Sequence, residues 1–261
     1  MNKHIQQMGK KLCIYNNIPR RTWDIVHIGH EMYNTNMTRL VKFTPGEFFH
    51  IYNRGTNKMN IFTNHFDYSR FQKLLYAVNS KDTLKLSDIE RSKVNPCPTW
   101  VIDRGETLVE IGAYCLMPNH FHLLIRSKDE KNTGTFLQRL LTSHSKYFNT
   151  KYDQSGSLFQ GKSKAEHVVG DNYLKYIFSY IHLNPVKIIQ RDWKENGITN
   201  IEEVKKYLSE YKYSSFRDFA GEKRRESKIL ELSNFPNYFS TKEYYIDEII
   251  EWLNYNNNEK S

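Results

Sequence analysis

The sequence predicts an α+β protein with a ferredoxin-like (RRM-like) fold, in which helices pack on one face of an antiparallel sheet. Short aromatic and β-branched segments alternate with segments of helical period in the order strand, helix, strand, strand, helix, strand, and a further helix follows. The 261 residues are enough for such a domain with an additional C-terminal part.

The first half of the chain contains three predicted strands and one helix. Residues 48–52 form a strand that runs into the turn at Asn53-Arg54-Gly55. Residues 64–78 carry apolar side chains at helical spacing, with Asn64 as the N-cap. Residues 107–117 form a long buried strand, Pro118-Asn119 breaks it, and residues 120–126 form its antiparallel neighbour.

The second half supplies the remaining elements. A helix follows Thr133, residues 166–169 form a short strand, and another helix begins at Asp171 and continues until Pro185 interrupts it. Beyond it, residues 201–213 and 241–255 have helical patterns. The helices are expected on one face of the sheet, and the other face is expected to stay free for a ligand.

Three regions are expected along the chain. Residues 1–36 are polar and without a clear period, which predicts a poorly ordered N-terminal extension, unless translation starts at Met37. Residues 37–190 form the main domain. Residues 191–261 form a helical C-terminal extension with the basic segment 223–225 (KRR), so it is a candidate for contact with a polyanion such as DNA.

Composition favours a polyanionic partner. The chain has 38 Lys and Arg against 29 Asp and Glu, a net charge of +9, and 14% aromatic residues that can stack on bases. The three cysteines contain no C-x-x-C pair, so neither a disulfide framework nor a structural zinc site is expected. We found no secretory signal and no apolar stretch of the roughly 18 to 20 residues that cross a bilayer, which predicts a cytoplasmic protein without membrane contact.

His120 and His122 form the most informative pair of side chains. Residues i and i+2 of a strand point to the same side of a sheet, so one strand presents two imidazoles, half of a metal site. The alternative is a hydrogen-bonded histidine pair without a ligand role.

The helix that begins at Asp171 carries Tyr180 and Asn184 one turn apart on one face. Such a helix beside the histidine pair would give a divalent cation the ligands His120, His122 and Asn184, with the Tyr180 hydroxyl close to it. Mixed imidazole and amide-oxygen ligands suit Mn²⁺ or Mg²⁺, and a phenol can attack a phosphodiester whose charge a metal neutralises.

Each of these residues has an alternative role. The chain contains 18 tyrosines, so a single tyrosine is a weak signal, and helical periodicity equally allows Tyr147, Tyr173 or Tyr176 a core or surface role. Asn184 before Pro185 is also a good N-cap for a following turn.

Four segments in this order resemble the REP-associated tyrosine transposases. They are residues 48–55 (FFHIYNRG), 114–124 (YCLMPNHFHLL), 157–162 (SLFQGK) and 180–187 (YIHLNPVK). These transposases belong to the HUH (His, hydrophobe, His) superfamily of single-strand DNA endonucleases and resemble the small single-tyrosine insertion-sequence transposases. The resemblance covers roughly residues 40 to 190.

The resemblance implies a metal-dependent DNA transposase that cleaves and rejoins single-stranded or hairpin DNA as a monomer or homodimer. Tyr180 matches the nucleophile, His120 and His122 match the metal pair, and Asn184 matches the third ligand of Mg²⁺ or Mn²⁺. Attack by Tyr180 would leave a 5′-phosphotyrosine and a free 3′-hydroxyl. No ATP is required.

Four basic residues are expected to contact DNA phosphates, because they lie at strand ends and loops around this site: Arg54, Arg126, Lys162 and Lys164. Two departures from the family pattern, Ser163 and Ile188-Ile189, concern the shape of the DNA groove rather than the proposed ligands.

Two other functions compete with the transposase. One is a domesticated protein of the same fold that binds hairpin DNA or RNA without cleaving it. The other is a zinc hydrolase or deaminase, which ranks low because the chain lacks the H-x-E and C-x-x-C patterns of those enzymes.

Overall fold

The structure, a computed structural model, describes residues 41–82, 84, 86, 99–239 and 245–250. The expected N-terminal extension, residues 1–36, lies outside the described residues. Parts of the predicted helical segment 241–255 lie outside them as well.

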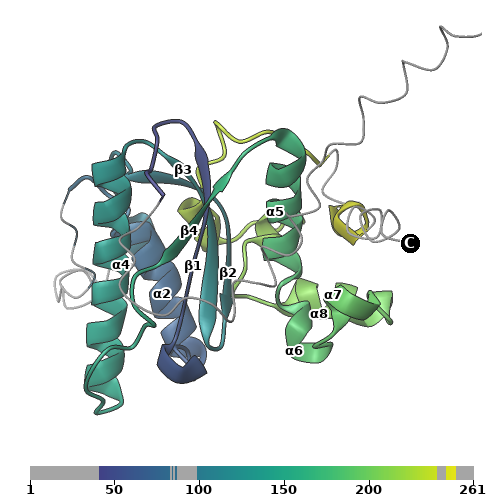
Figure 1. The fold of residues 1–261 in the computed structure, drawn as a ribbon, viewed down its shortest axis with the longest axis horizontal. Helices are drawn as coiled ribbons and strands as arrows, with labels where there is room; N and C mark the ends of the chain where they lie inside the picture. The colour runs from purple at the N-terminus through teal and green to yellow at the C-terminus, as the bar shows by residue number, and fades with distance from the viewer. Residues whose placement is uncertain (1–40, 83, 85, 87–98, 240–244, 251–261) are drawn as a thin grey trace, which may run out of the picture. The chain divides into compact units, whose positions relative to one another are not determined.

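Four antiparallel strands form one sheet (Figure 1). They are β1 (Phe48–Arg54), β2 (Val109–Met117), β3 (His120–Ser127) and β4 (Lys164–Val168). Their order is β2-β3-β1-β4, with β1 and β3 in the centre. Together with the alternation of strands and helices along the chain, this order confirms the predicted ferredoxin-like α+β fold.

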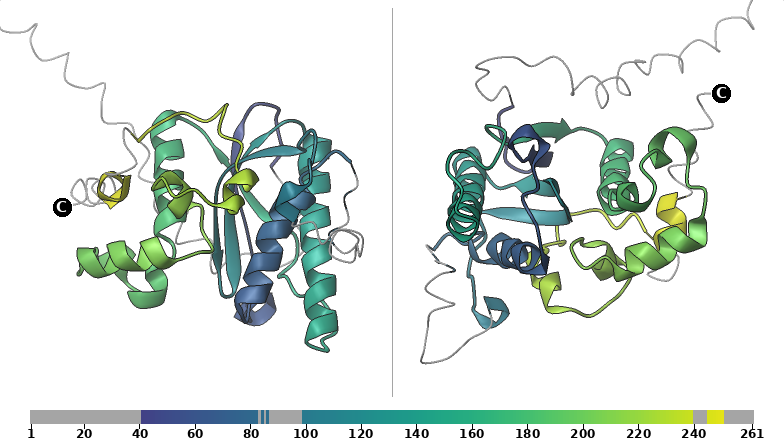
Figure 2. Two further views of the ribbon diagram at one scale, coloured as in Figure 1. Left: turned by 180° about the vertical axis from the view of Figure 1, so that it is seen from behind. Right: turned by 90° about the horizontal axis from the view of Figure 1, so that it is seen from below.

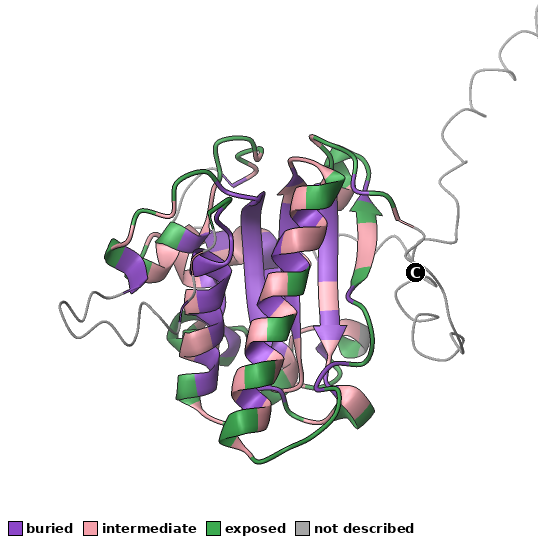
Figure 3. Cartoon of the chain, turned by 90° about the vertical axis from the view of Figure 1, so that its left-hand side faces the viewer, coloured by how far each residue is buried: buried purple, intermediate pink, exposed green. Residues whose placement is uncertain are grey.

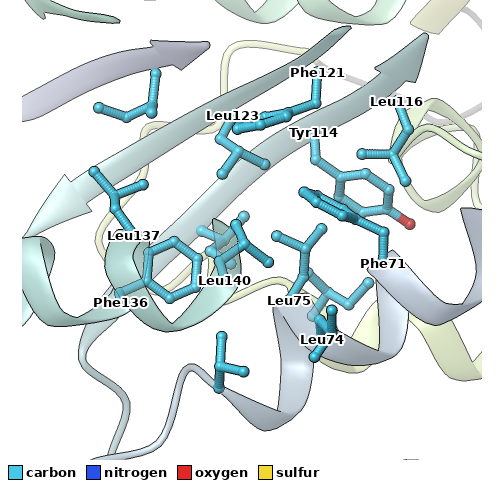
Figure 4. Packing of buried hydrophobic residues seen from close by; sticks show 14 of the residues in the cluster. Phe71, Leu74, Leu75, Tyr114, Leu116, Phe121, Leu123, Phe136, Leu137 and Leu140 are labelled. Atoms are coloured by element: carbon cyan, nitrogen blue, oxygen red, sulfur yellow. The ribbon is translucent and has the colours of Figure 1, made fainter. Parts of the chain in front are cut away.

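Helices α2 (His65–Ala77) and α4 (Glu130–Lys151) cover one face of the sheet. Figure 3 shows that the central strands are buried, whereas the helix sides turned away from the sheet are exposed. The core between sheet and helices consists of large apolar side chains, several of which Figure 4 shows in contact: Phe71, Leu75, Tyr114, Phe121, Phe136 and Leu140.

Helix α5 (Asp171–Leu183) packs on the opposite face (Figure 2). The expectation that this face is free is therefore wrong along α5, where a second apolar core joins the helix to β2 and to the C-terminal residues. The sequence pattern predicts the helix, but it does not say which side of the sheet the helix covers.

Shorter helices complete the described chain. After α5 come α6 (Val186–Ile189), α7 (Trp193–Asn196), α8 (Ile201–Glu210) and α9 (Phe216–Phe219), and residues 245–250 are also helical. Three 3₁₀ turns are η1 (Thr56–Lys58), η2 (Thr99–Val101) and η3 (Arg225–Ile229).

Capping residues set the helix starts. The predicted N-cap Asn64 is confirmed, because its side chain accepts from the backbone of Asp67 in a capping box at the start of α2. Helix α4 begins at Glu130, before the predicted start at Thr133, because the carboxylate of Asp129 accepts from the backbone N–H of Asn132 at 2.7 Å.

A buried hydrogen-bond network ties α5 to the C-terminal part. In α5, His182 contacts the Tyr245 hydroxyl through Nδ1, and its Nε2 lies 2.6 Å from Oγ of Ser215. The basic segment 223–225 also stabilises this part of the fold, because the side chain of Arg224 is buried and forms an ion pair with Asp218. Arg224 is therefore part of the fold rather than a contact to DNA.

Asp67 is a buried carboxylate that joins α2 to α4. It lies 2.6 Å from Nζ of Lys151 and accepts hydrogen bonds from Thr63, Tyr147 and Tyr152. Burial alone would raise the pKa of Asp67, but these donors outweigh burial and hold the pKa well below its usual value.

We expect Asp67→Asn to lower the free energy of unfolding at pH 7 by about 2 to 3 kcal/mol, because Lys151 loses its charged partner. A depressed folded-state pKa means that the carboxylate stabilises the protein above its unfolded pKa of about 3.9, and that this stabilisation is lost as pH falls below that value. The difference between wild type and variant in urea unfolding should therefore shrink in acid. Asp153→Asn, at an exposed carboxylate, is the control and should change little; an equal effect of both variants would contradict the account.

Candidate active site

The alternation of β3 directs the histidine pair toward α5. Phe121 and Leu123 belong to the core under α2 and α4, so His120 and His122 face the opposite side of the sheet. The two imidazole rings lie 5.0 Å apart between centroids and are nearly perpendicular. The structure thus brings the two rings together, as the i, i+2 spacing predicts.

Tyr180 reaches the histidines from α5. Its ring centroid lies 5.4 Å from that of His122 and 5.8 Å from that of His50, with the phenol edge-on to both imidazoles. Tyr176 and Tyr173 continue along the same helix face, and adjacent rings in this row are stacked about 6 Å apart. Of the three, Tyr180 is the one with ring contacts to the histidines of the sheet.

Asn184 is the C-cap of α5 and is fully buried. It does not serve as the N-cap of α6, whose N-cap is Pro185, so that alternative role is excluded. Neither Oδ1 nor Nδ2 of Asn184 has a hydrogen-bond partner among the described residues. A buried amide without a hydrogen-bond partner is costly in free energy, which makes this amide a candidate ligand for a cation.

The Asn184 amide also acts on its neighbours. Burial lowers the pKa of His120, and the contact with Asn184 partly offsets that lowering. Burial raises the pKa of Tyr180, and the contact with Asn184 partly offsets that rise. The amide therefore lies beside both groups, although it makes no hydrogen bond of normal geometry within the described residues.

Burial keeps both histidines neutral. It lowers the pKa of His120 to about 3, with Arg54 and Lys187 adding to the effect, and it lowers the pKa of His122 well below the usual value. Neutral imidazole is the form that binds metal ions. Burial also raises the pKa of Tyr180, while Lys187 and Asn184 oppose that rise, so the free phenol is protonated at neutral pH.

The ring nitrogens of His120 are distinguishable. Nδ1 lies 2.6 Å from Oδ1 of Asn119, and an amide oxygen only accepts, so Nδ1 carries the proton and Nε2 retains its lone pair. An acceptor that bonds the ring N–H opposite the ligating nitrogen is typical of metal-binding histidines.

The donor set fits a divalent cation. Two neutral imidazoles and an amide without a hydrogen-bond partner lie within one cluster, and these are ligand types that Mn²⁺ accepts. Within the described ranges, no group of three or more His, Cys, Asp and Glu side chains is arranged to hold a metal ion. The third ligand in this set would be the Asn184 amide, not an acidic or thiol side chain.

Two cations near Tyr180 were not identified from the sequence. Nζ of Lys194, in α7, lies 3.8 Å from the centroid of the Tyr180 ring. Lys187, in α6, lowers the pKa of both Tyr180 and His120. Lys187 belongs to the YIHLNPVK segment, so the motif itself could have indicated a cation beside Tyr180. The position of Lys194 beside Tyr180 depends on tertiary packing, which no local sequence pattern indicates.

Three further polar residues lie behind the histidine pair and were also not predicted. His50 and Tyr52 project from β1, and Glu166 projects from β4, toward the same side of the sheet as His122. Nε2 of His50 lies 2.9 Å from Nδ1 of His122, and the Tyr52 hydroxyl donates to Glu166 at 2.7 Å. The FFHIYNRG segment contained His50 and Tyr52 without indicating their partners.

The four predicted phosphate contacts divide into two groups. Arg54 lies opposite His120 in the β1–β3 pair, and Lys164 lies opposite Tyr52 on β4. Lys162 is exposed in the loop that leads into β4. These three are at the end of the sheet that carries the histidine pair.

Arg126 is not at this end. It lies six residues beyond His120 along β3, a distance of about 20 Å. Its guanidinium is 3.2 Å from Glu110 and also donates to the carbonyl of Gly46. Its role in the structure is to link β3 to β2 and to the start of β1, so we leave it out of the candidate site.

Gly55 closes this end of the sheet. A β carbon at this position would lie 2.2 Å from the carbonyl oxygen of Met59, so only glycine permits the close chain approach after β1. Its N–H donates to the carbonyl of Asn119, which holds the β2–β3 turn, next to His120, against the end of β1.

Part of the chain is similar to a known protein family. Residues 104–184 match the family model "Transposase IS200 like". No curated protein matches. The described residues also contain no helix with the length and apolarity that a bilayer-spanning segment needs.

Two solved structures are similar at low identity. One is the REP-associated tyrosine transposase bound to a REP hairpin, with 15% identity and a TM-score of 0.38 over 80% of this chain and 100% of that chain. The other is a bacterial tRNA(His) guanylyltransferase (Thg1)-like protein in complex with ATP, with 9% identity and a TM-score of 0.34 over 66% of this chain and 73% of that chain. The match of residues 104–184 to the IS200-like transposase model confirms the resemblance to tyrosine transposases that the sequence motifs predicted.

Proposed function

We propose that this protein is a metal-dependent transposase that cleaves and rejoins single-stranded or hairpin DNA through a 5′-phosphotyrosine on Tyr180. The observation that carries the proposal is the cluster of Tyr180, His120, His122 and the unpartnered Asn184 amide on one side of the sheet. The match of residues 104–184 to IS200-like transposases supports the same chemistry.

The reaction is a transesterification at phosphorus. The Tyr180 oxygen forms a bond to the phosphorus atom, the bond to the 3′ oxygen breaks, and that oxygen leaves as a 3′-hydroxyl after taking up a proton. The phenolic proton is released. One phosphodiester is exchanged for another, so the reverse attack by a 3′-hydroxyl rejoins strands without ATP.

The residues have separate roles in this scheme. His120, His122 and Asn184 would hold Mg²⁺ or Mn²⁺, which when bound neutralises charge on a non-bridging phosphate oxygen. Lys187 favours the phenolate form of Tyr180, because its positive charge lowers the pKa of the phenol. Arg54, Lys162 and Lys164 would contact phosphates of the bound strand.

Covalent trapping tests the proposal. A hairpin oligonucleotide from the DNA flanking the gene is labelled at either its 5′ or its 3′ end, incubated with the full-length protein and Mn²⁺ or Mg²⁺, and resolved by denaturing gel electrophoresis. We expect the 3′-labelled fragment to migrate with the protein and the 5′-labelled fragment to be released with a 3′-hydroxyl that terminal transferase extends.

Other outcomes contradict the proposal in distinct ways. An adduct that carries the 5′ label would mean a 3′-phosphotyrosine and the opposite polarity. Tight hairpin binding without adduct or nicking, with either metal, would favour the non-cleaving binding protein.

A further inference from the structure

A line of polar side chains extends from His122 into the sheet. Nδ1 of His122 lies 2.9 Å from Nε2 of His50, and Nδ1 of His50 lies 3.6 Å from Oε2 of Glu166. The other carboxylate oxygen of Glu166 accepts a 2.7 Å hydrogen bond from the Tyr52 hydroxyl. The line therefore runs from Tyr52 through Glu166 and His50 to His122.

Three neighbouring strands place these residues. His50 lies directly opposite Glu166 in the β1–β4 pair, and Tyr52 lies directly opposite His122 in the β1–β3 pair. Because residues two apart in a strand share a face, His50 and Tyr52 both project to the side of His122. Pairing of the central strand β1 with β3 on one side and with the edge strand β4 on the other thus fixes the arrangement.

The carboxylate determines which nitrogens carry protons. Nδ1 of His50 is buried and has no hydrogen-bond partner among the described residues, and the Glu166 carboxylate faces it at 3.6 Å. A lone pair facing a carboxylate would be repelled, so the proton of His50 lies on Nδ1 and the lone pair on Nε2. Nε2 of His50 then accepts the proton of His122 Nδ1, and the lone pair of His122 lies on its Nε2.

We infer that His50 and Glu166 are positioning residues that hold the His122 ring and its tautomer ready for a divalent cation. The inference rests on the proposed function of His122 as a ligand. Fixing the tautomer of a ligand histidine raises its affinity for metal, and so does a nearby carboxylate that increases its basicity. Tyr52 contributes by holding the Glu166 carboxylate in place.

The chain contains a matched control pair. His167 also pairs with a glutamate, Glu47, at 3.0 Å, and it also stacks on an aromatic ring, that of Phe49. Its register partner on β1 is Phe49, whereas His50 pairs with Glu166. The Glu47–His167 pair therefore reproduces the chemistry of the Glu166–His50 pair without the contact to His122.

Binding of Mn²⁺ to the DNA-free, full-length protein tests the inference, measured by calorimetry or by the EPR signal of free Mn²⁺. We expect Glu166→Gln and His50→Phe each to weaken Mn²⁺ binding roughly 10- to 100-fold, whereas Glu47→Gln and His167→Phe leave it within about twofold. His50→Phe keeps a planar ring stacked on His122 but removes the acceptor.

Nitrogen-15 NMR of the histidine rings supplies a second readout that a loss of packing alone does not produce. We expect wild-type His122 to be protonated on Nδ1, and we expect this signature to be lost in His50→Phe. Circular dichroism melting checks that each variant folds. If His50→Phe does not fold, Glu166→Gln and Tyr52→Phe carry the test, since the Glu166 side chain is 32% exposed.

The possible failures are distinguishable. Wild-type protein that binds no Mn²⁺ at millimolar concentration would overturn the metal site of the proposed function. Wild-type protein that binds Mn²⁺ while folded Glu166→Gln and His50→Phe bind it equally well would overturn only the positioning role. Equal losses in the Glu47 and His167 variants would also overturn it.

Discussion

Replacing Tyr180 with phenylalanine should abolish the covalent protein–DNA adduct and strand cleavage, a loss of at least about 10⁴-fold, because phenylalanine has no atom that can bond to phosphorus. Binding of the same hairpin should remain within a few-fold of wild type, since contacts to phosphates supply most of the affinity. Gel-shift titration and covalent trapping on one oligonucleotide measure the two effects separately.

Two tyrosines on the same helix provide matched controls. Tyr176 and Tyr173 form a stacked row with Tyr180, so each substitution by phenylalanine removes one hydroxyl from the same face of α5. We expect both control variants to form the adduct. An adduct that persists in Tyr180→Phe and disappears in Tyr176→Phe would move the nucleophile by one turn.

Replacing His120 or His122 with alanine should reduce cleavage by at least about 10³-fold, which corresponds to about 4 kcal/mol of transition-state stabilisation. Each substitution removes one neutral imidazole from the proposed ligand set, while the basic residues around the site stay in place. Cleavage assays over a range of Mn²⁺ concentrations, together with hairpin binding, measure the effect.

His167→Ala is the control for these variants, because His167 is partly exposed and pairs with Glu47 rather than with the site. Its activity should equal that of wild type. Full cleavage by His120→Ala at low Mn²⁺ concentration would show that the imidazole pair does not serve the reaction.

Local patterns in the sequence were sufficient for most of the fold. The alternating residues of β3 predict which side chains share a face, and the helical spacing after Asn64 predicts α2 with its cap. The sequence did not predict that α5 and the C-terminal residues cover the second face of the sheet. Periodicity identifies a helix but carries no information about which face of a distant sheet it contacts.

The candidate site was predictable where its residues are close in sequence. His120 with His122, and Tyr180 with Asn184, are set by strand and helix geometry over a few residues. The contact of His50 with His122 joins residues 72 apart and depends on the pairing of β1 with β3, which no local pattern specifies. Glu166 enters through a further pairing with β4.

Arg126 shows how a local rule was misapplied. Its position at a strand end suggested a place near the site, yet His120 begins the same strand and Arg126 lies near its other end. At about 3.3 Å per residue, that spacing alone separates the two side chains by about 20 Å. The ion pair with Glu110 then explains why an arginine is there.

Mass spectrometry of the trapped adduct tests the central claim most directly. Trypsin should release residues 176–187, which contain both Tyr176 and Tyr180, so fragmentation of this peptide locates the nucleotide phosphate on one hydroxyl. We predict a phosphodiester on Tyr180, formed only with Mg²⁺ or Mn²⁺ present. A phosphodiester on any other residue, or an adduct that forms equally well in EDTA, would contradict the convergence of a phenol and two imidazoles on one cation.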